Sequence, residues 1–335
     1  MGAYAEKQAV TELWGPFAKS IGMRSFDWTY FRLYKAYQGF SPEYITRDVF
    51  DPWLVRSLNP ARYVHSLNSK LAAHLYFYRL PRPVTHLMKL EDAYYDGEQR
   101  LVSENSAVGL LAGMDAFLIK PLFCFGGSGV RKINQAELPP DRRKAEAAAL
   151  VREYPDFVVQ EIIRQHPLLA ELNPSSVNTI RVNTLFLNGK TSLCCACVKY
   201  GKAGAPVDNY CSGGSWAGLD GEGRFTGQAS GKGALLEDRT PGGLPLAGRR
   251  IPHFDRLIGL VTEMHPAVFP MFHLAGWDVA INENGEPVVV EINFRNPVIQ
   301  VAQMLTGPFF KERTREVIDY AIAHPFRSFT DELLH

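Results

Sequence analysis

Apolar and polar positions repeat with two different periods along this chain of 335 residues, and the change of period divides it into three regions. Residues 1–75 carry large aromatic side chains at near-helical spacing and few strand signals, which predicts a helical N-terminal region. Residues 76–160 mix both patterns, with a helix expected over residues 142–153 between strands. Residues 161–335 alternate short β-branched runs with turn dipeptides, which predicts β-hairpins. The expected fold class is therefore α+β, with more than one lobe.

Two stretches stand out within this pattern. In the first region, Trp14, Trp28, Tyr30 and Tyr34 recur at a spacing that usually means packing inside a core. In the third region, residues 231–252 are rich in glycine, proline and charge, which predicts an exposed loop.

Composition narrows the class of protein. The formal net charge of +1 shows no basic excess, which argues against a general nucleic-acid or membrane-surface binder. No apolar stretch approaches the roughly 20 residues that span a bilayer, and the first residues lack the pattern of a secretory signal. Five cysteines, with Cys194, Cys195 and Cys197 crowded into one expected strand, favour reduced thiols in a cytoplasmic protein. Zinc is the alternative, although adjacent strand residues point to opposite faces.

A candidate phosphate-binding stretch lies in the second region. Residues 117–121, Phe-Leu-Ile-Lys-Pro, predict a strand that ends on Lys120, and residues 125–130, Phe-Gly-Gly-Ser-Gly-Val, follow as a glycine-rich loop. An ammonium group beside free backbone amides is a common way to hold a nucleotide triphosphate. A buried strand followed by an ordinary glycine-rich turn is the alternative for this stretch taken alone.

A second candidate site lies in residues 276–294, which predict two strands around Asn284-Gly285. A two-residue type I′ turn there would place Asp278 directly opposite Glu291, with Asn293 on the same face. Like charges opposed across strands are destabilising, which favours a cation between them. Two carboxylates and an amide oxygen suit Mg²⁺, and a solvated acidic pair is the alternative. Together with the phosphate-binding stretch, this hairpin predicts an ATP site.

At this point the chain resembles the ATP-grasp superfamily, and most closely its sugar-transfer-associated branch. The matching segments, in the order of the family, are Asn68-Ser69-Lys70, Leu80-Pro81-Arg82-Pro83, residues 117–121, residues 125–130, Val158-Val159-Gln160-Glu161, residues 166–181, Val207-Asp208-Asn209 with Gly213-Gly214, Gly276-Trp277-Asp278 and Glu291-Ile292-Asn293. The resemblance covers about residues 65–300. It implies an ATP-grasp fold, in which two α+β lobes with antiparallel sheets grip ATP, and a helical N-terminal region precedes them.

The resemblance also implies roles for individual residues. Lys70 and Lys120 look like the two lysines that contact ATP phosphates from different lobes. The residues Gly126, Gly127, Ser128 and Gly129 resemble the mobile loop that closes over the β- and γ-phosphates. The hinge that meets adenine corresponds to Gln160 and Glu161, for which ordinary polar residues at a strand end are the alternative. Asn178 occupies roughly the place where many members carry a ribose-binding acid. The magnesium ligands correspond to Asp278, Glu291 and Asn293.

Three basic residues are candidates for the chemistry. After the Asn188-Gly189 turn, Arg181 is expected to pack beside Cys194 and Ala196, where its charge is expensive unless it meets an anion. A phosphate or a substrate carboxylate is that anion, and a structural salt bridge is the alternative. Lys199 is a candidate for the same role. Arg295 lies two residues beyond Asn293 on the same strand face, in place for a transferred phosphoryl group. In contrast, His166, His265 and His273 are interpreted as loop-fixing residues.

The resemblance implies a Mg²⁺-dependent ligase that activates a substrate carboxylate as an acyl phosphate and joins it to an amine or, less often, a thiol. Its partners would be a small molecule or peptide bearing the carboxylate and an amine acceptor, with no nucleic acid or membrane. Two alternatives stay open, a kinase-like phosphotransferase and a nucleotide-binding protein without turnover. The aromatic N-terminal region is open to three roles, as a lobe that recognises the acceptor, a homodimer surface or a helical cap.

Overall fold

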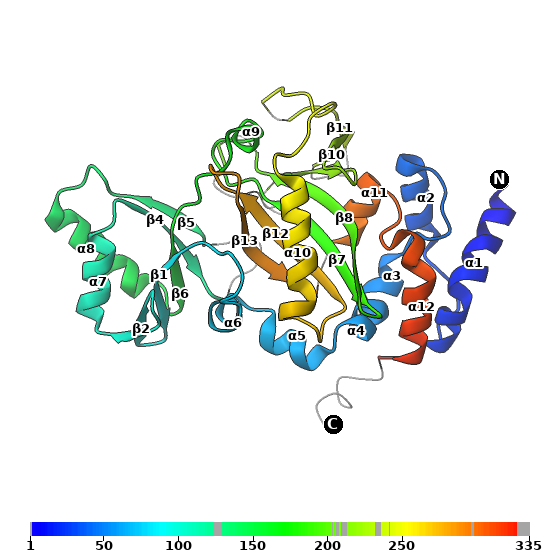
Figure 1. Ribbon diagram of the computed structural model, residues 1–335, viewed down its shortest axis with the longest axis horizontal. Coiled ribbons are helices and arrows are strands. Elements are labelled where there is room, and N and C mark those ends of the chain that lie inside the picture. Colours follow the sequence, from blue (N-terminus) through cyan, green and yellow to red (C-terminus); the bar gives the residue numbers. More distant parts are fainter. Residues whose placement is uncertain are drawn as a thin grey trace.

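The computed structural model describes residues 2–123, 129–202, 204–205, 208, 213–231, 236–240, 242–295 and 298–326. Two antiparallel sheets follow one another along the long axis of the molecule, and the N-terminal helices lie beyond the larger sheet (Figure 1). This arrangement agrees with the α+β class and the antiparallel pairing that the turn dipeptides predict.

The smaller sheet has the strand order β3-β2-β1-β6-β4-β5. Its strands are β1 (Thr85–Leu90), β2 (Ala93–Asp96), β3 (Leu101–Val102), β4 (Ala116–Pro121), β5 (Arg131–Asn134) and β6 (Phe157–Gln160). The helices α7 (Glu104–Ala112) and α8 (Pro140–Glu153) pack against it around a core that includes Phe117, Ile119 and Val159. The expected helix over residues 142–153 is confirmed, and it starts earlier because Pro140 suits the first helical turn.

The larger sheet has the strand order β11-β10-β9-β8-β7-β12-β13. Its strands are β7 (Ile180–Leu187), β8 (Lys190–Tyr200), β9 (Ser215–Leu219), β10 (Phe225–Ser230), β11 (Leu236–Glu237), β12 (Leu274–Ile281) and β13 (Pro287–Asn293), preceded by the short helix α9 (Pro167–Ala170). Helix α10 (Phe254–Val268) covers one face, where its apolar side packs on Trp277 and Val279 (Figure 1). Because side chains alternate between faces, Asp278 lies on the opposite face. The expectation of an exposed loop over residues 231–252 was wrong at Leu246 and Ile251, which are buried in this core.

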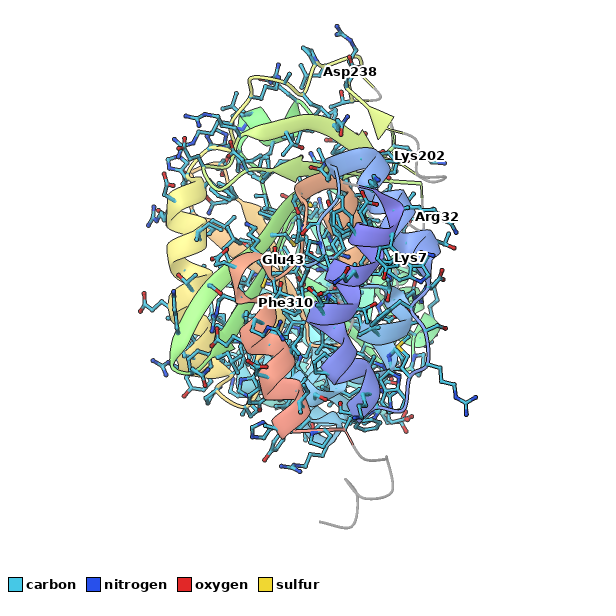
Figure 2. The ribbon with its side chains drawn as sticks, turned by 90° about the vertical axis from the view of Figure 1, so that its right-hand side faces the viewer. Lys7, Arg32, Glu43, Lys202, Asp238 and Phe310 are labelled. Atoms are coloured by element: carbon cyan, nitrogen blue, oxygen red, sulfur yellow. The ribbon has the colours of Figure 1, made fainter. Side chains whose placement is uncertain are left out.

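Most of the N-terminal helices share a core with the C-terminal end of the chain. The helices in that core are α1 (Ala3–Ser20), α2 (Trp28–Gln38), α3 (Arg47–Val49), the π-helix η1 (Phe50–Leu54) and α4 (Val55–Leu58), and the C-terminal elements are α11 (Ile299–Thr306), the 3-10 helix η3 (Lys311–Arg313) and α12 (Thr314–Ala323). The next two helices, α5 (Ala61–Leu67) and α6 (Lys70–Tyr76), instead place Val64 and Ala73 against the core of the large sheet. Trp14 and Tyr34 are fully buried in the core shared with the C-terminal end, whereas Lys7 and Arg32 lie on its outer surface (Figure 2). Gln303 ties the two segments together by exchanging hydrogen bonds with the backbone of Ile45. The expected core packing of the aromatic residues is confirmed.

Three cysteines are described, and all three are buried free thiols on β8. Burial raises the pKa of Cys195 to about 11, and it raises the pKa values of Cys194 and Cys197 as well. In the part of the chain that the structure describes, no three His, Cys, Asp or Glu side chains gather as a metal site would require. Cys124 and Cys211 lie outside the described residues.

A β-bulge changes the pairing expected for the β7–β8 hairpin. The turn is the expected two-residue one, since Leu187 pairs with Lys190 and Asn188 and Gly189 both have positive φ. Farther along, however, Cys194 is an extra residue that has no opposite partner, and the register shifts by one. Arg181 therefore lies opposite Cys197, so the expected position beside Cys194 and Ala196 was wrong.

The β12–β13 hairpin also departs from the expected turn. Its loop has three residues, because Asn282 N–H donates to the Glu286 carbonyl at 2.9 Å, and Gly285 takes a φ of +79°. A bulge at Val290 then shifts the register back, and Asp278 does lie opposite Glu291. The predicted pairing is confirmed, although the predicted two-residue turn was wrong.

Among the described residues, none of the helices has the length and apolar character that crossing a bilayer requires.

Candidate functional site

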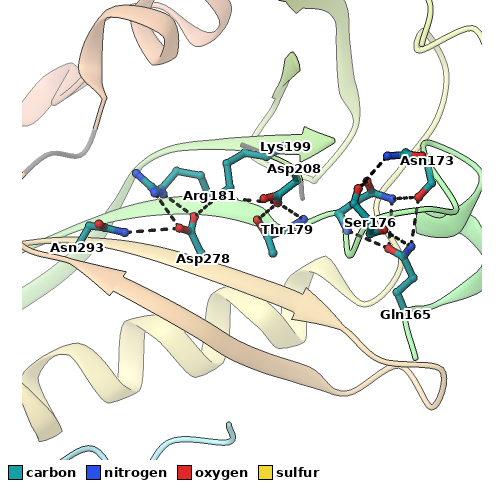
Figure 3. Close-up of polar contacts among 10 residues, drawn as sticks. Gln165, Asn173, Ser176, Thr179, Arg181, Lys199, Asp208, Asp278 and Asn293 are labelled. Carbon is teal, nitrogen blue, oxygen red and sulfur yellow. Dashed lines mark hydrogen bonds and ion pairs between the residues drawn. The ribbon is translucent and has the colours of Figure 1, made fainter. Parts of the chain in front are cut away.

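The centre of the candidate site is Asp278, whose side chain is only 3% exposed. Arg181, its neighbour on β7, donates from Nε to Oδ1 at 2.7 Å and from Nη2 to Oδ2 at 2.8 Å (Figure 3). Lys199 on β8 adds an ion pair, with Nζ 2.9 Å from Oδ1. Burial opposes the charge of the carboxylate, but the two cations outweigh it and lower the pKa of Asp278 to about 2.

These contacts bear on the expectation that the opposed carboxylates of Asp278 and Glu291 need a metal cation between them. The cations that neutralise Asp278 in this structure are Arg181 and Lys199, which the sequence reasoning did not connect to it. The structure also shows the salt bridge that was the alternative for Arg181. Burial opposes the charge of Arg181, but Asp278 and other nearby carboxylates raise its pKa above the usual value. A binding role for Arg181 therefore stays a prediction.

Glu291 and Asn293 complete the acidic hairpin on β13. Glu291 is exposed and faces Asp278 across the strand pair, while Asn293 donates weakly from Nδ2 to Asp278 Oδ2 at 3.5 Å. The three side chains can present the hard oxygen donors that Mg²⁺ prefers, so the residues fit the ion in kind. Oδ1 of Asp278 already accepts two short contacts, and the weak Asn293 contact at Oδ2 is the one that a cation would displace most easily. Their role as metal ligands stays a prediction.

Two asparagines from the N-terminal region hold the end of this hairpin. Asn59 is 2% exposed, and its Nδ2 donates to the carbonyls of Leu274 and Phe294 at 2.7 and 2.6 Å. Its Oδ1 accepts from the backbone N–H groups of His273 and Leu274. Asn68 Oδ1 accepts from Phe294 N–H at 2.8 Å. The segment that carries Glu291 and Asn293 is thus fixed from outside the sheet.

Asp208 also lies in the site, although the sequence suggested no role for it beyond the matching segment Val207-Asp208-Asn209. Its Oδ2 accepts from the backbone N–H of Thr179 at 3.0 Å and from the Thr179 hydroxyl (Figure 3). Lys199 Nζ lies 3.9 Å from the same oxygen. Lys199 therefore sits between two carboxylates, Asp208 and Asp278.

The second half of the site is a group of cations around Lys120, at the end of β4. Burial lowers the pKa of Lys120 to about 8, and the positive charges of Lys70 and Arg82 act in the same direction. Glu291, on the large sheet, and Asp208 act in the opposite direction, so both acids lie within electrostatic reach of this lysine of the small sheet. The contact of Lys70 and Lys120 with ATP phosphates stays a prediction.

His74, on α6, borders the same cations. Its Nδ1 lies 3.1 Å from the Thr85 hydroxyl. Burial, with Arg82 and Lys120, lowers the pKa of His74 to about 3, so the ring is neutral. Arg82 donates to the Ala73 carbonyl, and burial lowers its pKa to about 10. The sequence had suggested no role for His74, and it placed Arg82 only within the matching Leu80–Pro83 segment.

The glycine-rich loop can be located only at its two ends. Gly126, Gly127 and Ser128 lie outside the described residues. Gly129 has a φ of +72°, and a Cβ atom there would lie 2.8 Å from Cγ of Pro121. Gly129 therefore lies beside the strand end that carries Lys120.

The expected hinge lies at the end of β6. Gln160 is buried, with Nε2 3.5 Å from the Thr85 hydroxyl, and Glu161 Oε1 accepts from Val84 N–H at 2.9 Å. The backbone of Glu161 also donates to the Val84 carbonyl. The two residues join the start of β1 to the chain that enters the large sheet, and their contact with adenine stays a prediction.

Asn178 does not suit the nucleotide-binding role expected for it. Its side chain is fully buried, and its Nδ2 donates to Gln165 Oε1, the Leu169 carbonyl and the Asn173 carbonyl. Its Oδ1 accepts from Ser176. Because every polar atom of the side chain is used inside the loop, Asn178 organises the entry to β7 and cannot reach a ribose without breaking that network.

The remaining candidates lie at the edges of the site. Arg295 is exposed, directly after β13 and Phe294. The interpretation of two histidines as loop-fixing residues is confirmed, since His265 joins Thr184 to the Phe272 carbonyl and His273 joins the Phe186 carbonyl to Tyr320. His166 caps α9 through a contact with Leu168 N–H.

Solved structures match this chain at low sequence identity and with TM-scores below 0.5. D-alanyl-alanine synthetase A from Vibrio cholerae has a TM-score of 0.41 and 12% identity, over 80% of this chain and 64% of its own. L-amino acid ligase from Bacillus licheniformis has a TM-score of 0.40 and 14% identity, over 95% of this chain and 55% of its own. Biotin carboxylase from Campylobacter jejuni has a TM-score of 0.45 and 12% identity, over 81% of this chain and 50% of its own. The chain therefore spans between half and two thirds of the length of these structures.

No curated protein matches the sequence. The family described as sugar-transfer associated ATP-grasp matches residues 53–319, which include both sheets and all the described site residues. The two antiparallel sheets form the ATP-grasp fold. The chain belongs to the sugar-transfer associated ATP-grasp family.

Proposed function

We propose that this protein is an ATP-dependent ligase that activates a substrate carboxylate as an acyl phosphate and joins it to an amine. The observation that carries the proposal is the group of charges around Asp278, where Arg181 and Lys199 contact the carboxylate and Glu291 lies opposite it on β13. Lys120, from the small sheet, is close enough for Glu291 and Asp208 to influence its pKa. Cations next to carboxylates suit a polyphosphate and its metal ion.

Each group of side chains has a role in phosphoryl transfer that follows from its position. Lys70 and Lys120 hold the phosphates, and the loop that ends at Gly129 covers them. Arg181 and Lys199, on the sheet face beside Asp278, stabilise the charge that develops as the carboxylate oxygen attacks the γ-phosphorus and ADP leaves. Arg295 lies at the rim for the transferred phosphoryl group. Positioning and charge neutralisation of this kind supply most of the catalysis of phosphoryl transfer.

The proposed metal site uses Asp278, Glu291 and Asn293. When held by these residues, Mg²⁺ would supply charge neutralisation for the phosphates. Asp278 is held in its ionised form by Arg181 and Lys199, so it is ready to accept the ion at any pH well above 2. Asn59 and Asn68 hold the strand end that presents the other two ligands.

A substitution at Glu291 tests the catalytic part of the proposal. Glu291→Gln keeps the size of an exposed side chain, so the fold is retained while one metal ligand loses its charge. ADP release should fall on the order of 100-fold, the usual scale for losing one electrostatic contact to the transition state. Glu283→Gln, another exposed carboxylate on the same hairpin, is the matched control and should keep full activity. Unchanged ADP release in Glu291→Gln would refute the catalytic role.

A trapping experiment tests the carboxylate part. Hydroxylamine converts an acyl phosphate to a hydroxamate, whereas phosphate transferred to an alcohol gives none. We expect hydroxamate to accumulate with ATP, Mg²⁺ and an accepted carboxylic acid. Turnover that yields ADP and a stable phosphorylated product would show a kinase-like phosphotransferase instead.

A further inference from the structure

Several buried polar atoms without a hydrogen-bond partner gather on one face of the large sheet. Among the described residues, Arg181 Nη1 and Asn183 Oδ1 on β7, Trp216 Nε1 on β9 and Ser230 Oγ on β10 are buried and find no hydrogen-bond partner. Trp216 lies directly opposite Ser230 in the sheet. This is the face that also carries Asp278. Leaving one such atom unpaired in the interior is destabilising, so a cluster of them calls for an explanation.

The geometry shows that these atoms border one location. The guanidinium carbon of Arg181 lies over the indole of Trp216, 5.5 Å from the ring centroid. Two nitrogens of Arg181 bind Asp278, which leaves Nη1 directed away from that carboxylate. A Cβ atom on Gly276 would lie 3.0 Å from Asn183 Oδ1 and 3.7 Å from Cδ of Arg181. Arg181 and Asn183 therefore approach each other closely over Gly276, where a larger side chain would push them apart.

The chemistry of the unpaired atoms defines their ligand. Arg181 Nη1 and Trp216 Nε1 are donors, and one of them carries a charge, so they suit an anion. Asn183 Oδ1 is an acceptor, while the amide nitrogen of the same side chain already contacts Cys195 Sγ at 3.2 Å. Asn183 is thus suited to accept from an N–H or O–H group next to the anion.

We propose that Arg181, Trp216 and Asn183 form the subsite that holds a substrate carboxylate with a neighbouring amino or hydroxyl group, which makes the substrate class α-amino or α-hydroxy acids. This inference rests on the proposed function and specifies its substrate. Val298, Val301 and Leu305 pack on Trp216 and Cys197, so entry requires this cover to shift. The bound carboxylate lies beside Asp278, next to the proposed phosphates.

Trp216→Phe tests the subsite, because it keeps the aromatic packing and removes the donor. Trp14→Phe is the matched control, since Trp14 Nε1 already donates to the Pro42 carbonyl at 2.9 Å in the distant N-terminal core. Thermal unfolding of the full chain is followed with sodium acetate, glycine, glycolate and inorganic phosphate as probes. A hydrogen bond to a charged group predicts about 10- to 100-fold weaker carboxylate binding in Trp216→Phe.

We expect glycine or glycolate to stabilise the wild type more than acetate does. This stabilisation should be lost in Trp216→Phe and kept in Trp14→Phe. Without ligand, both substitutions shrink a buried ring and should lower stability, and Trp14→Phe should lower it further because only Trp14 also loses a hydrogen bond. Absence of any carboxylate effect on the wild type, or an equal effect on both variants, overturns the proposal. A Trp216-dependent effect of phosphate alone would make this a phosphate site and also overturn it. Stabilisation by ADP, measured separately, reports on the nucleotide site, so failure of the subsite and failure of the ligase proposal are distinguishable.

Discussion

Nucleotide binding should weaken as the pH rises through 8, because of Lys120. Burial first, and then Lys70 and Arg82, lower the pKa of this lysine from its usual value near 10.5 to about 8. A bound polyphosphate would favour the charged ammonium and raise that pKa again. Because the charged form binds, nucleotide affinity is fully present well below pH 8 and is lost as the pH rises through 8. Binding above pH 8 therefore takes up a proton.

The size of the effect follows from the fraction of Lys120 that is protonated in the free protein. With a pKa of about 8, affinity should be about twofold lower at pH 8 and about tenfold lower at pH 9 than at pH 7. The proton uptake at pH 9 should approach about 0.9 per nucleotide. The second ionisation of a phosphate group lies near pH 6, so the nucleotide itself contributes little above pH 7.

Isothermal titration calorimetry with ADP, in buffers of different ionisation enthalpy, measures both quantities. Lys120→Arg keeps the charge at every accessible pH, so its affinity should be flat from pH 7 to 9. A pH profile in Lys120→Arg that matches the wild type would refute the assignment to this lysine. A wild-type affinity that does not change between pH 7 and 9 would refute the depressed pKa or its place in the nucleotide site.

Two further predictions concern stability. Asn59→Ala removes the side-chain partner of four backbone groups, of which the His273 N–H keeps a contact with the Leu58 carbonyl, so it should lower the free energy of unfolding by about 3 kcal/mol in urea titrations, while exposed Asn284→Ala should change it little. Lys89→Met removes the ammonium that donates to two carbonyls at the C-terminal end of α8, at 2.9 and 3.0 Å. It should cost about 1–3 kcal/mol by the same assay, against a negligible change for exposed Lys132→Met, and equal stability of the two variants would contradict the reasoning.

Much of the architecture could be predicted because it is encoded locally. The aromatic periodicity of the first region, the helix at 142–153 and the turn at Asn188-Gly189 depend on neighbouring residues and are present in the structure. The pairing of Asp278 with Glu291 was also predicted, although two deviations cancel there, a longer turn and a bulge at Val290. In the β7–β8 hairpin no second deviation compensates for the register shift at Cys194. The neighbours expected for Arg181 were therefore wrong.

The partners of the site residues could not be predicted in the same way. Arg181 and Asp278 are 97 residues apart in the sequence, and they meet because β7 lies beside β12 in the sheet order. Asn178 matched the position of a nucleotide ligand by sequence, yet its amide is used by a loop that ends at β7. Such contacts depend on which strands become neighbours and on how loops close, and neither follows from local patterning.

The sequence by itself determined the class of fold, the lysine and glycine-rich stretch, the acidic hairpin and the resemblance to the family, because periodicity, turn residues and short motifs act over a few residues. The tertiary structure alone decided the register at the two bulges and the pairing of Asp278 with Arg181 and Lys199. It also decided the gathering of unpaired polar atoms around Trp216. The physical reason is that packing between distant strands and helices selects one bulge and one set of buried charge partners from many that the local sequence allows.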